Sequence, residues 1–171
     1  MVTTRVLIIG GSDAGISAAL RARETDPLAK VTVIVADAFP NYSICGLPFY
    51  LSGEVPDWHA LAHRTAGEIE EQGITLLLDH TARTIDVSGR SVEVEARDGD
   101  VRRLPYDRLV IATGAVPLRP PIEGLDLPGV YTLHTMEESF AVHAHLVERN
   151  PRAAVVIGGG YIGTEMARLR N

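Results

Sequence analysis

The stretch Val6-Leu7-Ile8-Ile9-Gly10-Gly11-Ser12-Asp13-Ala14-Gly15 decides the fold of this chain. Its first four residues form a short, continuous apolar run, which is typical of a buried parallel strand. The run ends in a glycine turn, and residues 16–24, rich in Ala, Leu and Arg, predict a helix that Asp26-Pro27 stops. A second apolar run at residues 31–35 predicts a second buried strand. Together these segments form a β-α-β unit of about 30 residues, which indicates an α/β fold.

Beyond this unit the chain alternates short strands and helices. Four short runs with glycine-containing turns between them predict an antiparallel β-meander inserted in the fold. A helix ending at Gly73 precedes the meander, and a further strand, a Pro- and Gly-rich linker, a helix and a last strand follow it. The predicted helices lie at residues 61–72 and 135–149, and the predicted strands at 74–78, 84–87, 92–96, 101–104, 109–112 and 153–157.

A second glycine motif follows the last apolar run. Gly158, Gly160 and Gly163 fit the spacing G-x-G-x-x-G. In this pattern the first glycine permits a tight turn, the second lets a pyrophosphate approach the backbone, and the third lets helix and strand pack closely. The helix N-terminus adds N–H groups and a favourable dipole. A glycine turn needed only for packing is the alternative interpretation.

The first glycine turn departs from this pattern, because Ser12 stands at the middle position between Gly10 and Gly15. Serine is small, so a phosphate can still approach. Asp37 follows the second strand, 22 residues beyond Gly15, where an acidic residue can accept hydrogen bonds from a ribose diol. A turn or helix-cap role is the alternative for Asp37. Its carboxylate would repel a 2′-phosphate, which favours FAD or NAD over NADP at this site.

Two dinucleotide motifs in one chain suggest two dinucleotides, the arrangement that hydride transfer from a nicotinamide to a flavin requires. The predicted α/β fold therefore contains a Rossmann-like dinucleotide-binding domain with an inserted antiparallel meander, followed by the start of a second Rossmann-like dinucleotide-binding domain. We expect these at residues 1–114 and 151–171, with a linker and connecting helix at 115–150. Because the second unit stops after half a helix, we expect a fragment or truncated product of a longer protein.

The composition narrows the possible partners. The chain has 171 residues, of which 46% are hydrophobic and 22% charged, as in ordinary globular proteins. A net charge of -6 without a Lys/Arg cluster argues against nucleic-acid or anionic-membrane binding. No apolar stretch approaches the roughly 20 residues that span a bilayer, and the N-terminus does not resemble a signal peptide. The single cysteine favours a reducing, cytoplasmic location.

Cys45, in the run Asn41-Tyr42-Ser43-Ile44-Cys45-Gly46-Leu47-Pro48, is the candidate redox centre. If a helix begins at Gly46, the thiol lies at its N-terminus, where the helix dipole favours the thiolate. A buried structural cysteine is the alternative. The chain's six histidines lack the companions that a metal site requires, so no metal is predicted.

Four segments resemble the pyridine nucleotide-disulfide oxidoreductases in order and spacing. They are the two glycine motifs, the segment around Cys45 and the run Leu109-Val110-Ile111-Ala112-Thr113-Gly114. The cysteine segment is the most specific, and it is similar to the single-cysteine branch of coenzyme A-disulfide reductases, NADH oxidases, NADH peroxidases and persulfide reductases. Glutathione reductase-like members carry a second cysteine, which this chain lacks.

The resemblance implies that the first Rossmann-like domain binds FAD and that the second binds NAD(P). It further implies an FAD-dependent NAD(P)H oxidoreductase, homodimeric at full length, that reduces a disulfide or persulfide of the coenzyme A-disulfide type through Cys45. The oxidised form of a lone thiol would be a mixed disulfide, a persulfide or a sulfenic acid. In the family, Thr113 and Gly114 would lie near the FAD and close the FAD-binding pocket. The backbone of Ala82 would contact the adenine ring. The cofactor-binding residues so assigned are Gly10, Gly11, Ser12, Asp13, Ala14, Gly15, Ala36, Asp37, Ser43, Cys45, Ala82, Ala112, Thr113, Gly114, Gly158, Gly160 and Gly163.

Asp13 bears on the choice within the branch. Peroxidase and oxidase members of the branch carry the pattern G-x-x-H-x-G at the first turn, with a histidine at the position where this chain has Asp13. An aspartate cannot supply the imidazole that supports oxygen or peroxide chemistry, so the sequence favours sulfur substrates. A simple helix-start role is the alternative interpretation of Asp13, since the helix dipole favours an acidic residue there. The alternatives to the leading prediction are an NADH oxidase or peroxidase and a truncated, non-catalytic flavin-binding module.

Overall fold

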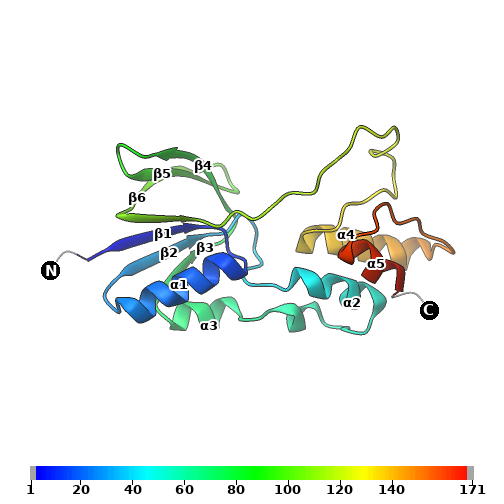
Figure 1. Cartoon of the computed structure of the whole chain (residues 1–171), viewed down its shortest axis with the longest axis horizontal. Helices are drawn as coiled ribbons and strands as arrows, with labels where there is room; N and C mark the ends of the chain where they lie inside the picture. The colour runs from blue at the N-terminus through cyan, green and yellow to red at the C-terminus, as the bar shows by residue number, and fades with distance from the viewer. Residues whose placement is uncertain (1–2, 169–171) are drawn as a thin grey trace. The chain divides into compact units, whose positions relative to one another are not determined.

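The computed structural model describes residues 3–168, which form two compact units (Figure 1). Unit 1 consists of the chain up to Tyr42 and of His63–Gly114. Unit 2 consists of Ser43–Ala62 and of the chain from Ala115 onward. The segment that carries Cys45 therefore belongs to unit 2, whereas the first glycine turn belongs to unit 1.

Unit 1 is built on a four-stranded parallel sheet in the order β3-β2-β1-β7. Its strands are β1 Arg5–Ile9, β2 Lys30–Ile34, β3 Ile74–Leu77 and β7 Arg108–Ile111. The strand β1 lies in the middle of the sheet, where it pairs with β2 from Arg5↔Lys30 to Ile9↔Ile34 and with β7 on its other side. The parallel β-α-β unit expected from the opening stretch is confirmed.

Two helices cover one face of this sheet and an antiparallel meander covers the other: α1 Asp13–Thr25, α3 Ala66–Glu71, β4 His80–Asp86, β5 Ser91–Ala96 and β6 Val101–Pro105 (Figure 1). The alternation of side chains along β1 produces these layers. Ile8 packs in one buried cluster with Ile16 of α1 and Ile69 of α3. Leu7 belongs to a second cluster, with Val92 of the meander. Both faces of the central strand are thus buried, as its continuous apolar run indicates.

Two predicted elements of unit 1 are corrected by the structure. The prediction that residues 74–78 belong to the meander is wrong, because Ile74–Leu77 pairs in parallel with β2 as an edge strand of the main sheet. The helix predicted at residues 61–72 begins only at Ala66. The helix starts there because Thr65 and Glu68 form a capping box. Thr65 Oγ1 accepts from Glu68 N at 3.3 Å, and the Glu68 carboxylate accepts from Thr65 N at 2.7 Å.

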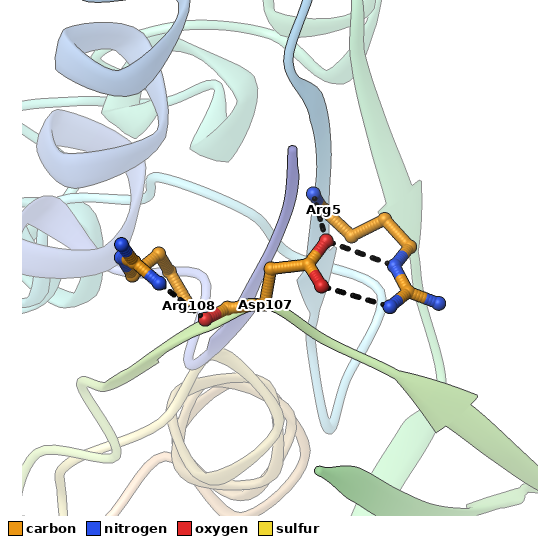
Figure 2. A network of polar contacts seen from close by, with 3 residues as sticks. All are labelled: Arg5, Asp107 and Arg108. Atoms are coloured by element: carbon orange, nitrogen blue, oxygen red, sulfur yellow. Dashed lines mark hydrogen bonds and ion pairs between the residues drawn. The ribbon is translucent and has the colours of Figure 1, made fainter. Parts of the chain in front are cut away.

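Arg5 and Asp107 clamp the amino ends of β1 and β7 together (Figure 2). Asp107 Oδ2 accepts from Arg5 N at 2.8 Å and from Nε at 3.0 Å, and Oδ1 accepts from Nη2 at 2.9 Å. These bonds hold the pKa of Asp107 well below its usual range and raise the pKa of Arg5. Arg108 Nη1 adds a hydrogen bond to the Asp107 carbonyl oxygen at 2.9 Å. The clamp lies at the end of β1 that is opposite the glycine turn.

Unit 2 consists of short helical segments. These are the 3₁₀ turns η1 Ile44–Gly46 and η2 Trp58–Leu61 and the helices α2 Leu47–Ser52, α4 Met136–Arg149 and α5 Tyr161–Arg168. Tyr50 of α2 stacks on His143 of α4, with 5.0 Å between ring centroids, and meets Phe140 edge-on at 6.2 Å. The helix predicted at residues 135–149 is confirmed, with Thr135 as its N-cap. Within residues 3–168, no helix combines the length and apolarity that a membrane crossing needs.

The prediction of a buried strand at residues 153–157 is wrong. This run forms no strand, and the side chains of Val155 and Ile157 are 89% and 72% exposed. An apolar strand is buried when neighbouring strands and helices cover it, and none of the strands described between residues 3 and 168 pairs with this run.

Candidate functional site

The glycine turn at the carboxyl end of β1 is closely packed. A Cβ atom added to Gly10, whose φ is +115°, would lie 2.0 Å from the carbonyl oxygen of Ala112. A Cβ on Gly15 would lie 1.8 Å from the carbonyl oxygen of Gly10, and one on Gly11 would lie 2.6 Å from Cγ2 of Val35. Only glycine fits these positions, because every added atom would overlap backbone or a buried side chain.

The second glycine turn repeats this local geometry 148 residues later. Gly158 has φ +121°, and a Cβ on Gly163 would lie 2.1 Å from the carbonyl oxygen of Gly158. The helix α5 begins three residues after Gly158, just as α1 begins three residues after Gly10. The middle position, Gly160, has no atom within 4 Å of an added Cβ. Gly163 therefore serves packing and Gly158 permits the positive φ of the turn, whereas Gly160 leaves the backbone open to an approaching ligand.

The first turn of α1 offers backbone donors to such a ligand. Ser12 is the N-cap, but its side chain makes no capping hydrogen bond. Ser12, Asp13 and Ala14 are all exposed. The first N–H groups of a helix have no partner within the helix, and a phosphate is well suited to accept from them. Both the packing and the uncapped helix end thus fit the phosphates of a dinucleotide.

The end of β2 contains a polar turn and an apolar contact. Asp37 Oδ1 accepts from Phe39 N at 2.8 Å, which is the turn role that the sequence left open. The side chain of Val35, which is 4% exposed, lies against Gly11. Ala36, between Val35 and Asp37 in the sequence, is exposed. Ribose binding by Asp37 stays a prediction, and Val35 is a neighbour of the glycine turn that sequence reasoning did not single out.

The end of β7 reaches the same turn. Ala112 N donates to Ile9 O at 2.8 Å, and the Ala112 carbonyl faces Gly10. Gly114 has φ +68° and open space where its Cβ would be. Ala82 lies in β4, beside an irregularity in its pairing with β5. The structure thus brings Ala112 to the glycine turn, while contacts of Thr113, Gly114 and Ala82 with a dinucleotide stay predictions.

A polar cluster of Asp13, Asn41 and His63 adjoins the glycine turn. Asp13 Oδ1 accepts from Asn41 Nδ2 at 2.8 Å and lies 3.0 Å from His63 Nδ1. Asn41 N donates to Gly11 O at 2.7 Å, and His63 N donates to Asn41 O at 2.9 Å. Sequence reasoning singled out neither Asn41 nor the pairing of His63, because the partners lie 28 and 50 residues from Asp13. The Phe39-Pro40-Asn41 turn is the only local signal.

In unit 2, Cys45 lies in the 3₁₀ turn η1, directly before α2, and it is exposed. The turn is held from both sides, since Gly46 N donates to Ser43 O at 3.1 Å and Ser43 N donates to Leu61 O at 2.8 Å. A Cβ on Gly46 would lie 2.6 Å from Leu61 Cδ2. The exposure of Cys45 contradicts the alternative of a buried structural cysteine, while its redox role stays a prediction.

Comparison with known proteins gives one family for nearly the whole chain. Residues 4–170 match the family model described as pyridine nucleotide-disulphide oxidoreductase. The chain is 36% identical over 166 residues to the CoA-dependent NAD(P)H sulfur oxidoreductase of Pyrococcus abyssi, covering 97% of this chain and 36% of the relative. It is 32% identical over 164 residues to the NADH oxidase of Methanocaldococcus jannaschii, covering 95% of this chain and 37% of the relative.

Solved structures agree with this. The NAD-dependent persulfide reductase from A. fulgidus matches with a TM-score of 0.90 and 37% identity, covering 97% of this chain and 32% of that one. The water-forming NADH oxidase from Lactobacillus brevis, bound to NADH, matches with a TM-score of 0.87 and 29% identity, covering 98% of this chain and 37% of that one. The chain thus spans about a third of the length of the proteins that it matches.

Proposed function

Because the chain belongs to the pyridine nucleotide-disulphide oxidoreductase family, we propose that the full-length protein is an FAD-dependent NAD(P)H oxidoreductase that reduces a disulfide or persulfide at Cys45. The observation that carries this proposal is the exposed thiol of Cys45 on its 3₁₀ turn, in a chain with two glycine turns of matching geometry. Relatives named for CoA-dependent sulfur and persulfide reduction support coenzyme A-linked sulfur as the substrate class.

The residues assigned to the two cofactors divide between the two turns. For FAD we assign the turn from Gly10 to Gly15, with the first N–H groups of α1 as phosphate donors and Ala112 at its side. For NAD(P)H we assign the turn from Gly158 to Gly163, where Gly160 leaves room for the pyrophosphate. FAD, when bound, would accept the hydride of the nicotinamide and supply two electrons to sulfur.

Cys45 carries the sulfur chemistry in this proposal. Its thiolate attacks one sulfur of a disulfide RSSR, so that a Cys45–SR bond forms, the S–S bond breaks and RS⁻ leaves. Two electrons from NAD(P)H then cleave the mixed disulfide to the Cys45 thiolate and a second thiol. The overall balance is RSSR + NAD(P)H + H⁺ → 2 RSH + NAD(P)⁺. No second cysteine of this chain is available to form an internal disulfide, since Cys45 is the only one.

A comparison of electron acceptors tests the proposal. The purified full-length protein should show flavin absorbance, and it should consume NADH or NADPH faster with coenzyme A disulfide under nitrogen than with oxygen alone. Production of two thiols per NAD(P)H establishes the stoichiometry. NAD(P)H consumption with oxygen only would contradict disulfide reduction, and a colourless protein that takes up no FAD would contradict any flavoprotein role.

An NADH oxidase is the second candidate, and one contact favours it. Asp13 occupies the position at which the oxidase members of the family carry a histidine. The imidazole of His63 nevertheless lies 3.0 Å from the Asp13 carboxylate. An imidazole is thus present at the first turn of α1 although the sequence motif lacks it. The relatives named NADH oxidase support this candidate as well. Oxygen-dependent activity without disulfide reduction would establish it in place of the first.

A further inference from the structure

We propose that Asn41 binds the flavin dinucleotide directly, with its amide oxygen accepting a hydrogen bond from a sugar or ribityl hydroxyl group of that ligand. The inference rests on the proposed flavin function and adds a specific polar contact to the glycine turn, whose other contacts are made by backbone.

The observation behind the inference is a buried acceptor without a partner. Asn41 is 3% exposed, and its Oδ1 atom has no hydrogen-bond partner among the described residues. Buried polar atoms are almost always paired, because water that would otherwise solvate them is excluded. An acceptor left in this state beside a candidate ligand site needs a donor from outside the chain.

The orientation of the amide group is fixed by its neighbour. Asn41 Nδ2 lies 2.8 Å from Asp13 Oδ1. A carboxylate accepts hydrogen bonds but does not donate, so the NH₂ group must face Asp13 and the oxygen must face away from it. Exchanging the two amide atoms would place two acceptors against each other. The unpartnered atom is therefore the oxygen.

The backbone of Asn41 is also fixed against the glycine turn. Its φ of +58° lies in the left-handed region, which asparagine tolerates better than most residues do. Its N–H bonds to Gly11 O at 2.7 Å and its carbonyl accepts from His63 N at 2.9 Å. The Asp13 carboxylate and the backbone N–H of His63 thus position Asn41, and a strained residue held from several sides is typical of ligand sites.

The chemistry of the missing partner follows from the site. The phosphates of a dinucleotide carry only acceptors and would bind to the N–H groups of α1, so they cannot satisfy Asn41 Oδ1. Hydroxyl groups of the adjoining sugar or ribityl chain are donors. The nearby Asp13 carboxylate also disfavours a second anion at this position and favours a neutral donor. A buried water is the rival occupant.

The test compares glycine substitutions at two left-handed positions. Asn41→Gly keeps the backbone conformation accessible and removes the acceptor, whereas Arg90→Gly makes the same exchange at a residue with φ +47° in an exposed turn. FAD binding to the full-length apoprotein is measured by quenching of flavin fluorescence. We expect Asn41→Gly to raise the Kd for FAD about 10-fold, equivalent to ~1.4 kcal/mol, and Arg90→Gly to leave it within about 2-fold.

The outcomes separate the inference from the proposed function. A wild-type protein that does not bind FAD contradicts the proposed function and the inference with it. A wild-type protein that binds FAD, with Asn41→Gly within 2-fold of it, contradicts the inference alone and assigns the oxygen to water. Titrations with FMN and with ADP locate the hydroxyl group that bonds to Asn41. The loss of affinity in Asn41→Gly must appear with the half of FAD that carries this hydroxyl group, and an unchanged affinity for both halves contradicts the inference.

A second measurement covers a glycine variant that fails to fold. Asparagine-selective ¹⁵N labelling of the wild-type protein reports the side-chain amide of Asn41 directly. We expect its signals to shift on addition of FAD, because the oxygen gains a donor while the NH₂ group stays on Asp13. Signals that remain unchanged at saturating FAD would contradict the inference.

Discussion

The Nδ1 atom of His63 lies 3.0 Å from Oδ1 of Asp13, so an imidazole from a residue 50 positions later meets the first turn of α1. Because a carboxylate only accepts, Nδ1 carries the hydrogen in this contact and Nε2 is the remaining ring nitrogen. The pair fixes both the tautomer and the orientation of the ring. Whether that ring takes part in oxygen chemistry decides between the two proposed functions.

Replacement of His63 tests this participation. If the imidazole supports oxygen reduction, His63→Ala lowers NADH consumption with oxygen by at least about 10-fold, in the range of lost acid–base catalysis, while the rate with coenzyme A disulfide stays within 2-fold. His59→Ala is the matched control, because His59 Nδ1 also lies on a carboxylate, 2.7 Å from Asp57 Oδ1. Equal losses in both assays would instead indicate a structural role for His63.

Alanine substitutions at two helical glycines test the packing of the first turn. Gly15→Ala places a methyl group 1.8 Å from the Gly10 carbonyl oxygen, and we expect it to lower the free energy of unfolding by about 2–3 kcal/mol. Gly67→Ala in α3 meets no atom within 4 Å, and we expect no change or a gain of up to about 1 kcal/mol. Urea unfolding followed by circular dichroism measures both. A Gly15→Ala protein as stable as wild type would show that the turn can open.

The second turn separates packing from binding. Gly163→Ala places a methyl group 2.1 Å from the Gly158 carbonyl oxygen, whereas Gly160→Ala places one in open space. We therefore expect Gly163→Ala to lower the melting temperature and Gly160→Ala to leave it unchanged. In the full-length protein, Gly160→Ala should raise the KM for NAD(P)H by about 10-fold, because the methyl group occupies the approach of the pyrophosphate. An unchanged KM would contradict nucleotide binding at this turn.

The clamp between Arg5 and Asp107 makes stability depend on pH. Hydrogen bonds from Arg5 depress the pKa of Asp107 in the folded protein from its ordinary 3.8. A depressed carboxyl pKa stabilises the fold above the unfolded pKa, and this stabilisation is lost as pH falls through the folded pKa. The melting temperature of Asp107→Asn should therefore lie below that of wild type by a constant amount from pH 7 to 5, and the difference should shrink below about pH 4.

Glu71→Gln, at an exposed position of α3, is the control for this measurement. It should follow the wild-type melting temperature at every pH. A difference between Asp107→Asn and wild type that persists undiminished at pH 2 would show that the charge of Asp107 does not contribute.

Cys45→Ser tests the redox role of the thiol. In the full-length protein we expect turnover with coenzyme A disulfide to fall by at least about 1,000-fold, because a hydroxyl cannot form the mixed disulfide. Flavin absorbance and melting temperature should stay close to wild type, since the Cys45 side chain is exposed. Turnover at the wild-type rate would show that Cys45 is not the redox centre.

Several elements with a clear hydrophobic period and flanking turn residues could be predicted from the sequence. The strands β1, β2 and β7 and the helix α4 lie within two residues of their predicted bounds, because hydrophobic period and turn residues encode them directly. The run at residues 153–157 has the same apolar character but forms no strand. A sequence shows that such a run favours burial, but burial depends on partners that the run itself does not specify.

The candidate site divides in the same way. The glycine turns and Cys45 lie in contiguous motifs. The structure leaves no room for a Cβ atom at Gly10, Gly15 and Gly163, and it gives Gly158 a positive φ. The cluster of Asp13, Asn41 and His63 comes from three separate segments. Its geometry depends on the left-handed turn at Asn41 and on the return of the chain at His63, which no spacing rule describes. Likewise, Val35 lies against Gly11 because of strand register, not because of residue type.

The place of β1 in the middle of its sheet has a consequence for synthesis on the ribosome. Residues 5–9 leave the ribosome well before β7, which covers their second edge and begins only at Arg108. At a translation rate of about 5–20 residues per second, roughly 5–20 s pass between the two. During that time a nascent apolar strand has one open edge, on which another chain could add. The second edge of β1 is therefore open to pairing with another chain until Asp107 meets Arg5 and β7 covers that edge.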